Sequence, residues 1–158
     1  MHTEIGLYVH IPFCRSKCAY CDFASVPGQE GLWPAYRDVL LAEIAAVPPL
    51  RPITLYAGGG TPTVWPAEYL VAVIEAARSA GLSRDAEATV EANPGTVDEP
   101  KLAALREAGF NRISLGVQST FDANLRLLGR THSYAEAEEA VRLARQAGFD
   151  NLSVDLIY

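Results

Sequence analysis

The sequence has few of the features that mark membrane or nucleic-acid-binding proteins. It holds 13 Lys and Arg against 19 Asp and Glu, a formal net charge of −6, so it lacks the clustered basic surface that nucleic acids require. No apolar run approaches the ~18 residues of a membrane span, and the N-terminus lacks the basic region of a signal peptide. We therefore expect a cytoplasmic protein with no transmembrane segment and no nucleic-acid partner.

Cysteine is also scarce. The chain of 158 residues has three cysteines, and all lie between Cys14 and Cys21. An odd number of closely spaced cysteines, without an export signal, is a poor framework for disulfides. Metal binding or redox chemistry is the better interpretation.

The organisation of the chain is a regular alternation of two kinds of segment. Short β-branched and aromatic runs predict strands at residues 5–11, 53–56, 88–91, 112–117 and 151–157. Longer segments rich in Ala, Leu, Glu and Arg predict helices at residues 33–47, 67–80, 99–108 and 134–147. Ser133 and Glu136 have the spacing of a capping box at the start of the last helix.

Repeated strand–helix–strand units predict an α/β fold with parallel strands and helical crossovers. A doubly wound open sheet and a (β/α) barrel both fit this pattern. Residues 154–158 still have the pattern of a strand. We therefore expect one domain, residues 1–158, that is incomplete at its C-terminus and needs at least one more unit to close a barrel.

The cysteines have the spacing C-x3-C-x2-C and follow the first predicted strand. Thiolates at Cys14, Cys18 and Cys21 suit an iron–sulfur cluster or zinc. A [4Fe–4S] cluster normally takes four cysteines, so three leave one iron open for a substrate or cofactor, as at catalytic zinc sites.

Two alternatives to a cluster remain open. A Cys3His zinc site would take His10 as its fourth ligand, although zinc knuckles usually begin C-x2-C. Three buried structural cysteines fit less well, because Arg15, Ser16 and Lys17 indicate an exposed loop.

The stretch from Tyr8 to Phe23, YVHIPFC–RSK–CAYCDF, resembles the radical S-adenosylmethionine (SAM) superfamily. Within it, the HemW group, whose members resemble oxygen-independent coproporphyrinogen III oxidases, is the most similar. The resemblance implies a partial (β/α) barrel with about five strands in this chain. It also implies a [4Fe–4S] cluster on Cys14, Cys18 and Cys21. The amino and carboxylate groups of SAM would chelate the fourth iron, and one electron from the cluster would then yield a 5′-deoxyadenosyl radical.

A second observation is independent of the cysteines. The four later strands run into glycine or polar residues at Gly58-Gly59-Gly60-Thr61, Glu91, Gly116-Val117-Gln118 and Asp155. In barrels the C-terminal strand ends form the active-site face, so we expect one shared site. The triple glycine would let the backbone approach a ligand and expose its N–H groups, or it would be only a tight turn.

The resemblance implies cofactor contacts at nine positions through the motifs GGGTP, E-x-N-P-G, RISLGVQS, L-G-R-x-H and D-L-I-Y and through the tyrosines beside the cysteines. These positions are Tyr8, Tyr20, Gly59, Gly60, Thr61, Glu91, Gln118, Arg130 and Asp155. The residues alone leave alternatives open: both tyrosines as packing aromatics, Glu91 as a surface carboxylate and Arg130 as a solvent-facing loop residue. We expect His132 to be a hydrogen-bonding loop residue.

Two departures bear on function. Oxidases of this type carry another cysteine two positions after the third, where this chain has Phe23, and they usually have a long extension before the motif. Both departures favour a heme chaperone of the HemW group, with heme or a porphyrin as ligand, a flavodoxin-like electron donor and a heme acceptor protein as partners. The heme site would lie beyond residue 158. The alternatives are a radical enzyme of the coproporphyrinogen oxidase type and a non-catalytic cluster or zinc-binding domain.

Overall fold

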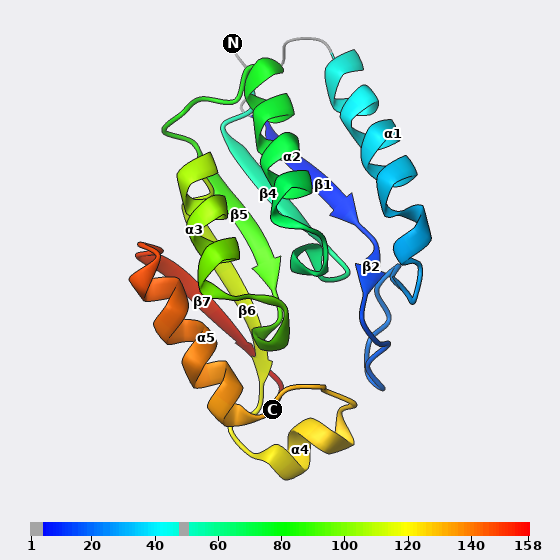
Figure 1. The fold of residues 1–158 in the computed structure, drawn as a ribbon, viewed down its shortest axis with the longest axis vertical. Helices are drawn as coiled ribbons and strands as arrows, with labels where there is room; N and C mark the ends of the chain where they lie inside the picture. The colour runs from blue at the N-terminus through cyan, green and yellow to red at the C-terminus, as the bar shows by residue number, and fades with distance from the viewer. Residues whose placement is uncertain (1–4, 48–50) are drawn as a thin grey trace.

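The computed structural model describes residues 5–47 and 51–158, which form a parallel sheet covered by helices (Figure 1). The sheet has five strands in the order β1-β4-β5-β6-β7, and each strand runs parallel to its neighbours. Their bounds are Gly6–Ile11, Thr54–Gly59, Glu87–Ala92, Arg112–Gln118 and Asn151–Leu156. The predicted α/β class and parallel crossovers are confirmed.

The strand order decides between the two architectures that the sequence left open. A doubly wound sheet reverses its order at a switch point and carries helices on both faces. Here each new strand is added on the same side of the preceding one, and the large helices lie together on one face of the sheet (Figure 1). This is the arrangement of part of a (β/α) barrel.

The four long helices have nearly the predicted bounds. They are α1 (Trp33–Ala46), α2 (Ala67–Ser79), α3 (Glu99–Ala108) and α5 (Tyr134–Gln146). The capping box is confirmed: Ser133 Oγ accepts the N–H of Glu136, whose carboxylate accepts the N–H of Ser133. Gly109 ends α3 with a φ of 108°, a left-handed conformation that favours glycine.

Six short elements have no counterpart among the predicted segments. The strands β2 (Phe13–Cys14) and β3 (Val26–Pro27) have two residues each. The 3₁₀ turns are η1 (Glu30–Leu32), η2 (Pro62–Val64) and η3 (Pro94–Thr96), and α4 (Asp122–Leu127) is a helix of under two turns. None of these is long enough to show a hydrophobic period.

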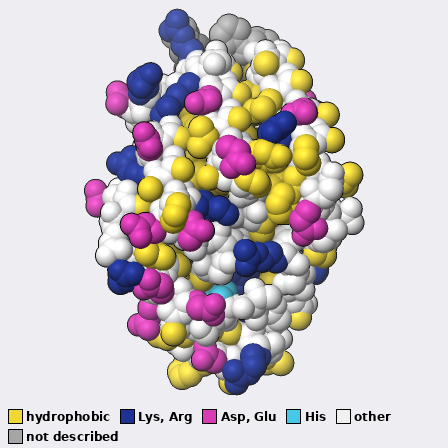
Figure 2. Space-filling model, in the orientation of Figure 1, with side chains coloured by type: hydrophobic (Ala, Val, Ile, Leu, Met, Phe, Trp, Pro, Cys, Tyr) yellow, Lys and Arg dark blue, Asp and Glu magenta, His cyan; other side chains and the backbone are white. Residues whose placement is uncertain are grey.

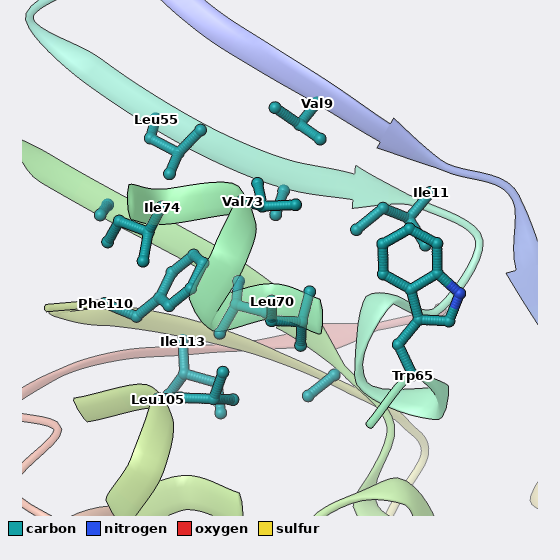
Figure 3. Packing of buried hydrophobic residues seen from close by; sticks show 14 of the residues in the cluster. Val9, Ile11, Leu55, Trp65, Leu70, Val73, Ile74, Leu105, Phe110 and Ile113 are labelled. Atoms are coloured by element: carbon teal, nitrogen blue, oxygen red, sulfur yellow. The ribbon is translucent and has the colours of Figure 1, made fainter. Parts of the chain in front are cut away.

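The hydrophobic core lies between the helices and one face of the sheet (Figure 3). Trp65 is completely buried against Ile11, as expected for a packing residue, and the core continues from it through Leu70 to Ile74 and Phe110, which are also completely buried (Figure 3). Removing Trp65 would create a large cavity at a cost of about 3–5 kcal/mol. The core thus fixes the position of the loop that follows β4.

Side chains alternate between the two faces of each strand. On β5, Ala88 and Val90 are buried under the helices, while the hydroxyl of Thr89 meets Arg112 on the opposite face. Ser153 donates to Ser114, which donates to Asp155 on that same face. The polar face of the sheet therefore leads to the C-terminal strand ends.

The helix-bearing face is shown in Figure 2. Charged side chains of both signs are scattered over α3 and α5, and apolar side chains gather around α1 and α2. Within the described ranges, no helix is long and apolar enough to cross a membrane.

Candidate cluster and cofactor site

A cavity of about 800 Å³ opens at the C-terminal ends of the strands. Small-molecule sites in proteins typically measure roughly 300–1,000 Å³. All five strands of the main sheet supply side chains to it, directly or from the residues that follow them, as the polar strand ends predicted. The lining includes Cys14, Cys18, Tyr20, Cys21, Gly60, Thr61, Glu91, Asn93, Gly116, Gln118, Arg130 and Asp155.

The cysteine loop is held in place by the backbone and by His10. The three thiols are free and half-buried. The N–H of Cys21 donates to the carbonyl of Cys18 at 3.2 Å, and the N–H of Ala19 donates to Leu128 at 3.1 Å. His10 Nε2 lies 2.9 Å from the carbonyl of Ala24. The loop is thus tied to β1 at one end and to the segment after α4 at the other.

The surroundings of His10 argue against the zinc alternative. Both ring nitrogens of His10 have partners within the chain, because the Tyr8 hydroxyl lies 3.1 Å from Nδ1. Across residues 5–47 and 51–158, no group of three or more His, Cys, Asp and Glu side chains is placed to hold a single metal ion. A four-iron cluster takes one thiolate per iron, so its ligands need not converge on one point. Three thiols around a cavity fit that group.

Arg130 lines the cavity and is not a solvent-facing loop residue. Its Nη2 donates to the carbonyl of Gly116 and to Asn93 Oδ1, each at 2.5 Å. Its Nη1 lies 3.5 Å from Cys18 Sγ and 3.4 Å from the hydroxyl of Tyr20. Its buried Nε has no hydrogen-bond partner within the described part of the chain. A permanent positive charge therefore faces the cysteine loop.

In the glycine loop, the N–H groups of Gly59, Gly60 and Thr61 are not free for a ligand, contrary to one of the two interpretations of the triple glycine. Gly59 donates its N–H to Glu91, Gly60 to the carbonyl of Ile11, and Thr61 to the carbonyl of Phe13. These donors were not predictable because they depend on pairing with a distant segment. Close approach of the backbone is confirmed: a Cβ on Gly60 would lie 2.5 Å from the carbonyl oxygen of Phe13.

Glu91 lines the cavity and also fixes its neighbours. Its carboxylate accepts the hydroxyl of Tyr56 at 2.7 Å and the N–H of Gly59 at 3.1 Å. Burial, and then the hydrogen bond to the Glu91 carboxylate, raise the pKa of Tyr56 well above its ordinary value. Tyr56 therefore stays a neutral hydrogen-bond donor.

Gln118 and Asp155 both line the cavity, from the ends of β6 and β7. Gln118 has a φ of 70°, in the left-handed region that side chains rarely adopt. It lies at a register shift between β6 and β7. Asp155 Oδ1 accepts the hydroxyl of Ser114 at 3.4 Å. Backbone strain held at a site of this kind often accompanies function.

Two of the predicted contact residues do not line the cavity. Tyr8 is 56% exposed and stacks on Tyr56, with ring centroids 6.1 Å apart. Gly59 donates its N–H to the Glu91 carboxylate and does not reach the cavity lining. The structure adds Tyr56, Asn93 and Ser114 to the lining. The period of two along a strand, counted back from Gly58 and Gly116, could have indicated Tyr56 and Ser114.

Residues 8–158 match the model of the radical SAM superfamily. The chain belongs to this superfamily. It is 41% identical to the heme chaperone HemW of Lactococcus lactis over 152 residues, covering 96% of this chain and 40% of that protein. It is 40% identical to the oxygen-independent coproporphyrinogen III oxidase of Paracoccus denitrificans over 165 residues, covering 99% of this chain and 36% of that protein.

Among solved structures, the chain resembles the coproporphyrinogen III oxidase HemN of Escherichia coli, a radical SAM enzyme. The TM-score is 0.89 at 32% identity, over 98% of this chain and 37% of that one. The chain thus spans about two fifths of the length of these relatives. Membership implies a four-iron cluster and SAM as cofactors, and the cavity, its three thiols and the unpartnered Nε of Arg130 fit them.

Proposed function

We propose that residues 1–158 form the radical SAM core of a heme chaperone of the HemW type, which binds heme and passes it to an acceptor protein. Heme chaperones of this name are among the most similar relatives, at 41% identity for the Lactococcus lactis protein. Because an oxidase is almost equally similar, overall identity does not separate the two functions. The separating observation is a single position, Phe23.

Phe23 occupies the place where the resemblance assigns a further cysteine to the oxidases. The ring cannot ligate a metal, and it is 73% exposed while it lines the cavity. An exposed aromatic ring beside a cavity is a common feature of sites for apolar or flat ligands. The ring suits a macrocyclic ligand of either kind, so what favours the chaperone is the absence at position 23 of the cysteine that the resemblance assigns to oxidases.

The cofactors would be held by the residues around the cavity. Cys14, Cys18 and Cys21 are the proposed cluster ligands. When bound, the cluster and SAM together supply one-electron reductive cleavage of a carbon–sulfur bond. Arg130 offers its planar guanidinium to a carboxylate.

Further proposed contacts to SAM come from two groups of residues. Gln118 and Asp155 offer polar atoms from β6 and β7, and Gly60 and Thr61 offer a close backbone surface. The remaining sequence-based candidates are divided by the cavity. Tyr20 and Glu91 line it, whereas Tyr8 and Gly59 do not.

The second candidate function is oxidation of coproporphyrinogen III. It is supported by the Paracoccus denitrificans relative and by the fold shared with HemN. The flavodoxin-like electron donor, the heme acceptor and the cytoplasmic location stay predictions.

Two assays on the anaerobically reconstituted full-length protein separate the candidates. The first titrates hemin into the protein, follows the Soret band, and then adds a heme-free acceptor. The second incubates the protein with coproporphyrinogen III, SAM and a reductant. The chaperone proposal expects heme binding and transfer without turnover of the porphyrinogen. Turnover of coproporphyrinogen III without heme binding would refute the chaperone proposal and support the oxidase function.

A further inference from the structure

A chain of hydrogen bonds connects two of the three cysteines across the cavity. It runs from Cys14 Sγ to Thr61 Oγ1 at 3.7 Å, and from Thr61 Oγ1 to Asn93 Nδ2 at 3.2 Å. From Asn93 Oδ1 it continues to Arg130 Nη2 at 2.5 Å, and Arg130 Nη1 reaches Cys18 Sγ at 3.5 Å. Asn93 is the middle of this chain, and it contacts neither cysteine itself.

The direction of each bond in the chain follows once Cys14 is a thiolate ligand, because a thiolate can only accept. A guanidinium can only donate, so the Asn93 atom that faces Arg130 must be the oxygen. The other amide atom is therefore the NH₂ group, which donates to Thr61 Oγ1. The Thr61 oxygen accepts that bond, and its proton donates to Cys14 Sγ when this sulfur is a thiolate ligand of the cluster. Both cysteines thus face a donor whose orientation depends on Asn93.

The backbone of Asn93 is held firmly enough to fix its side chain. Its carbonyl accepts the N–H of Thr96 at 2.9 Å and the hydroxyl of Thr96 at 2.7 Å. Thr96 Oγ1 lies 2.6 Å from Thr63 Oγ1, and both residues are buried. Lys101 Nζ donates to the carbonyls of Thr63 and Thr96. Preorganised supporting residues of this kind keep polar groups aimed at a site.

We propose that Asn93 is a positioning residue that directs the Thr61 hydroxyl to the sulfur of Cys14 and holds Arg130 against the sulfur of Cys18. Hydrogen bonds to cysteine sulfur help to set the reduction potential of an iron–sulfur cluster. They stabilise the more negative reduced form and so raise the potential. Asn93 therefore tunes the electron affinity of the cluster. This inference rests on the cluster ligands of the proposed function but not on heme.

The test compares Asn93→Asp, Thr61→Val and the double variant in the reconstituted protein. Asn93→Asp keeps an acceptor for Arg130 but draws the Thr61 hydroxyl toward its own carboxylate. We expect each single variant to lower the midpoint potential in an EPR-monitored titration. The added charge lowers the potential in any background, whereas the change in hydroxyl direction needs Thr61. The shift caused by Asn93→Asp must therefore be smaller in the Thr61→Val background.

Two controls separate this role from general loosening of the fold. Thr61→Ser keeps the hydroxyl and is expected to keep the wild-type potential. Asn111→Asp is the matched control, because Asn111 also makes two side-chain hydrogen bonds, to Ala88 and Ala86, at the opposite ends of the strands. It is expected to change stability and leave the potential unchanged.

Three outcomes would overturn the proposal. The first is an equal shift from Asn93→Asp in both backgrounds, the second an unchanged potential in Thr61→Val, and the third an equal shift in Asn111→Asp. Iron content is measured first on every variant. A wild-type protein that binds no iron would instead refute the cluster assignment, whereas a loaded cluster without heme binding would refute only the chaperone.

Discussion

The carboxylate of Glu91, at the end of β5, accepts the backbone N–H of Gly59 on the neighbouring strand at 3.1 Å. Its other oxygen accepts the hydroxyl of Tyr56 at 2.7 Å. One acidic side chain therefore fixes the glycine loop against the sheet. The sequence alone left Glu91 as either a surface carboxylate or a cofactor contact, and the structure gives it a bracing role at the wall of the cavity.

Glu91→Ala is expected to destabilise the fold, because it leaves two donors without their acceptor. Loss of a partner for half-buried polar groups costs about 1–3 kcal/mol. Glu91→Gln should cost less, since its amide oxygen still accepts one bond. Urea unfolding of the apo-protein measures both. Tyr56→Phe is the control, because it removes only one of the two donors and leaves the bond from Gly59. Equal losses of stability in the Ala and Gln variants would contradict the bracing role.

Cys18→Ala is expected to abolish a stable four-iron cluster, because the chain has three cysteines in all and each would bind a separate iron. Iron and acid-labile sulfide, measured after anaerobic reconstitution, should fall from about four of each per chain to near background. An unchanged content would show that Cys18 is not a ligand.

Gly60→Ala is expected to disturb the cysteine loop. The new Cβ would lie 2.5 Å from the carbonyl oxygen of Phe13 and 2.8 Å from the carbonyl carbon of Pro12, both of them backbone atoms that lead into Cys14. Cluster loading should fall, and the unfolding midpoint with it. Gly31→Ala is the matched control, since nothing lies within 4 Å of the position that its new methyl group would take. Equal behaviour of the two variants would refute the close approach.

Gln118 offers a test that separates strain from binding. Its φ of 70° costs a non-glycine residue about 1–2 kcal/mol. Gln118→Ala and Gln118→Gly should both weaken SAM binding by calorimetry, by about tenfold, while the glycine variant should be the more stable of the two. Asp155→Ala should likewise leave the cluster intact and weaken SAM binding. Unchanged affinity would remove the substituted residue from the site.

The long elements were predictable because each is a local pattern. The helix Tyr134–Gln146 and the strand Arg112–Gln118 carry an apolar period over several turns or pleats, and the helix Trp33–Ala46 is marked by a composition rich in Ala and Leu. Helix α4 was missed because six residues show no period. The one-sided sheet of a partial barrel was implied by the family resemblance and is confirmed. The residue pattern alone left it open, since the strand order depends on how distant segments pair.

Seven of the nine predicted contact residues and all three cysteines line the cavity, but the hydrogen bonds among them could not be predicted. The spacing of the cysteines and the polar strand ends indicate which residues gather, because parallel strands end at one edge. They do not indicate where hydrogen bonds go. The N–H groups of Gly60 and Thr61 are donated to Ile11 and Phe13, and Asn93 joins Thr61 to Arg130, through contacts between segments far apart in the chain.

The buried ring of His132 predicts a loss of stability in mild acid. Its Nε2 lies 3.2 Å from the carbonyl of Val117, and burial, with a smaller effect from Arg130, lowers its pKa below the ordinary 6.5. The unfolded chain therefore binds a proton near pH 6.5 that the folded chain does not. This contribution to stability is complete above about pH 6.5 and is lost as the pH falls toward the lowered pKa.

Urea unfolding of the wild type and His132→Gln at about pH 7.5 and about pH 5.5 measures this contribution. Glutamine keeps an N–H donor for Val117 and does not titrate. The wild type should lose more stability between the two pH values than the variant does, because only the wild type has a histidine at this position that must be kept neutral to fold. Parallel losses in the two proteins would show that the acid sensitivity arises elsewhere, among carboxylates such as Glu136, whose pKa is lowered by hydrogen bonds from Ser133.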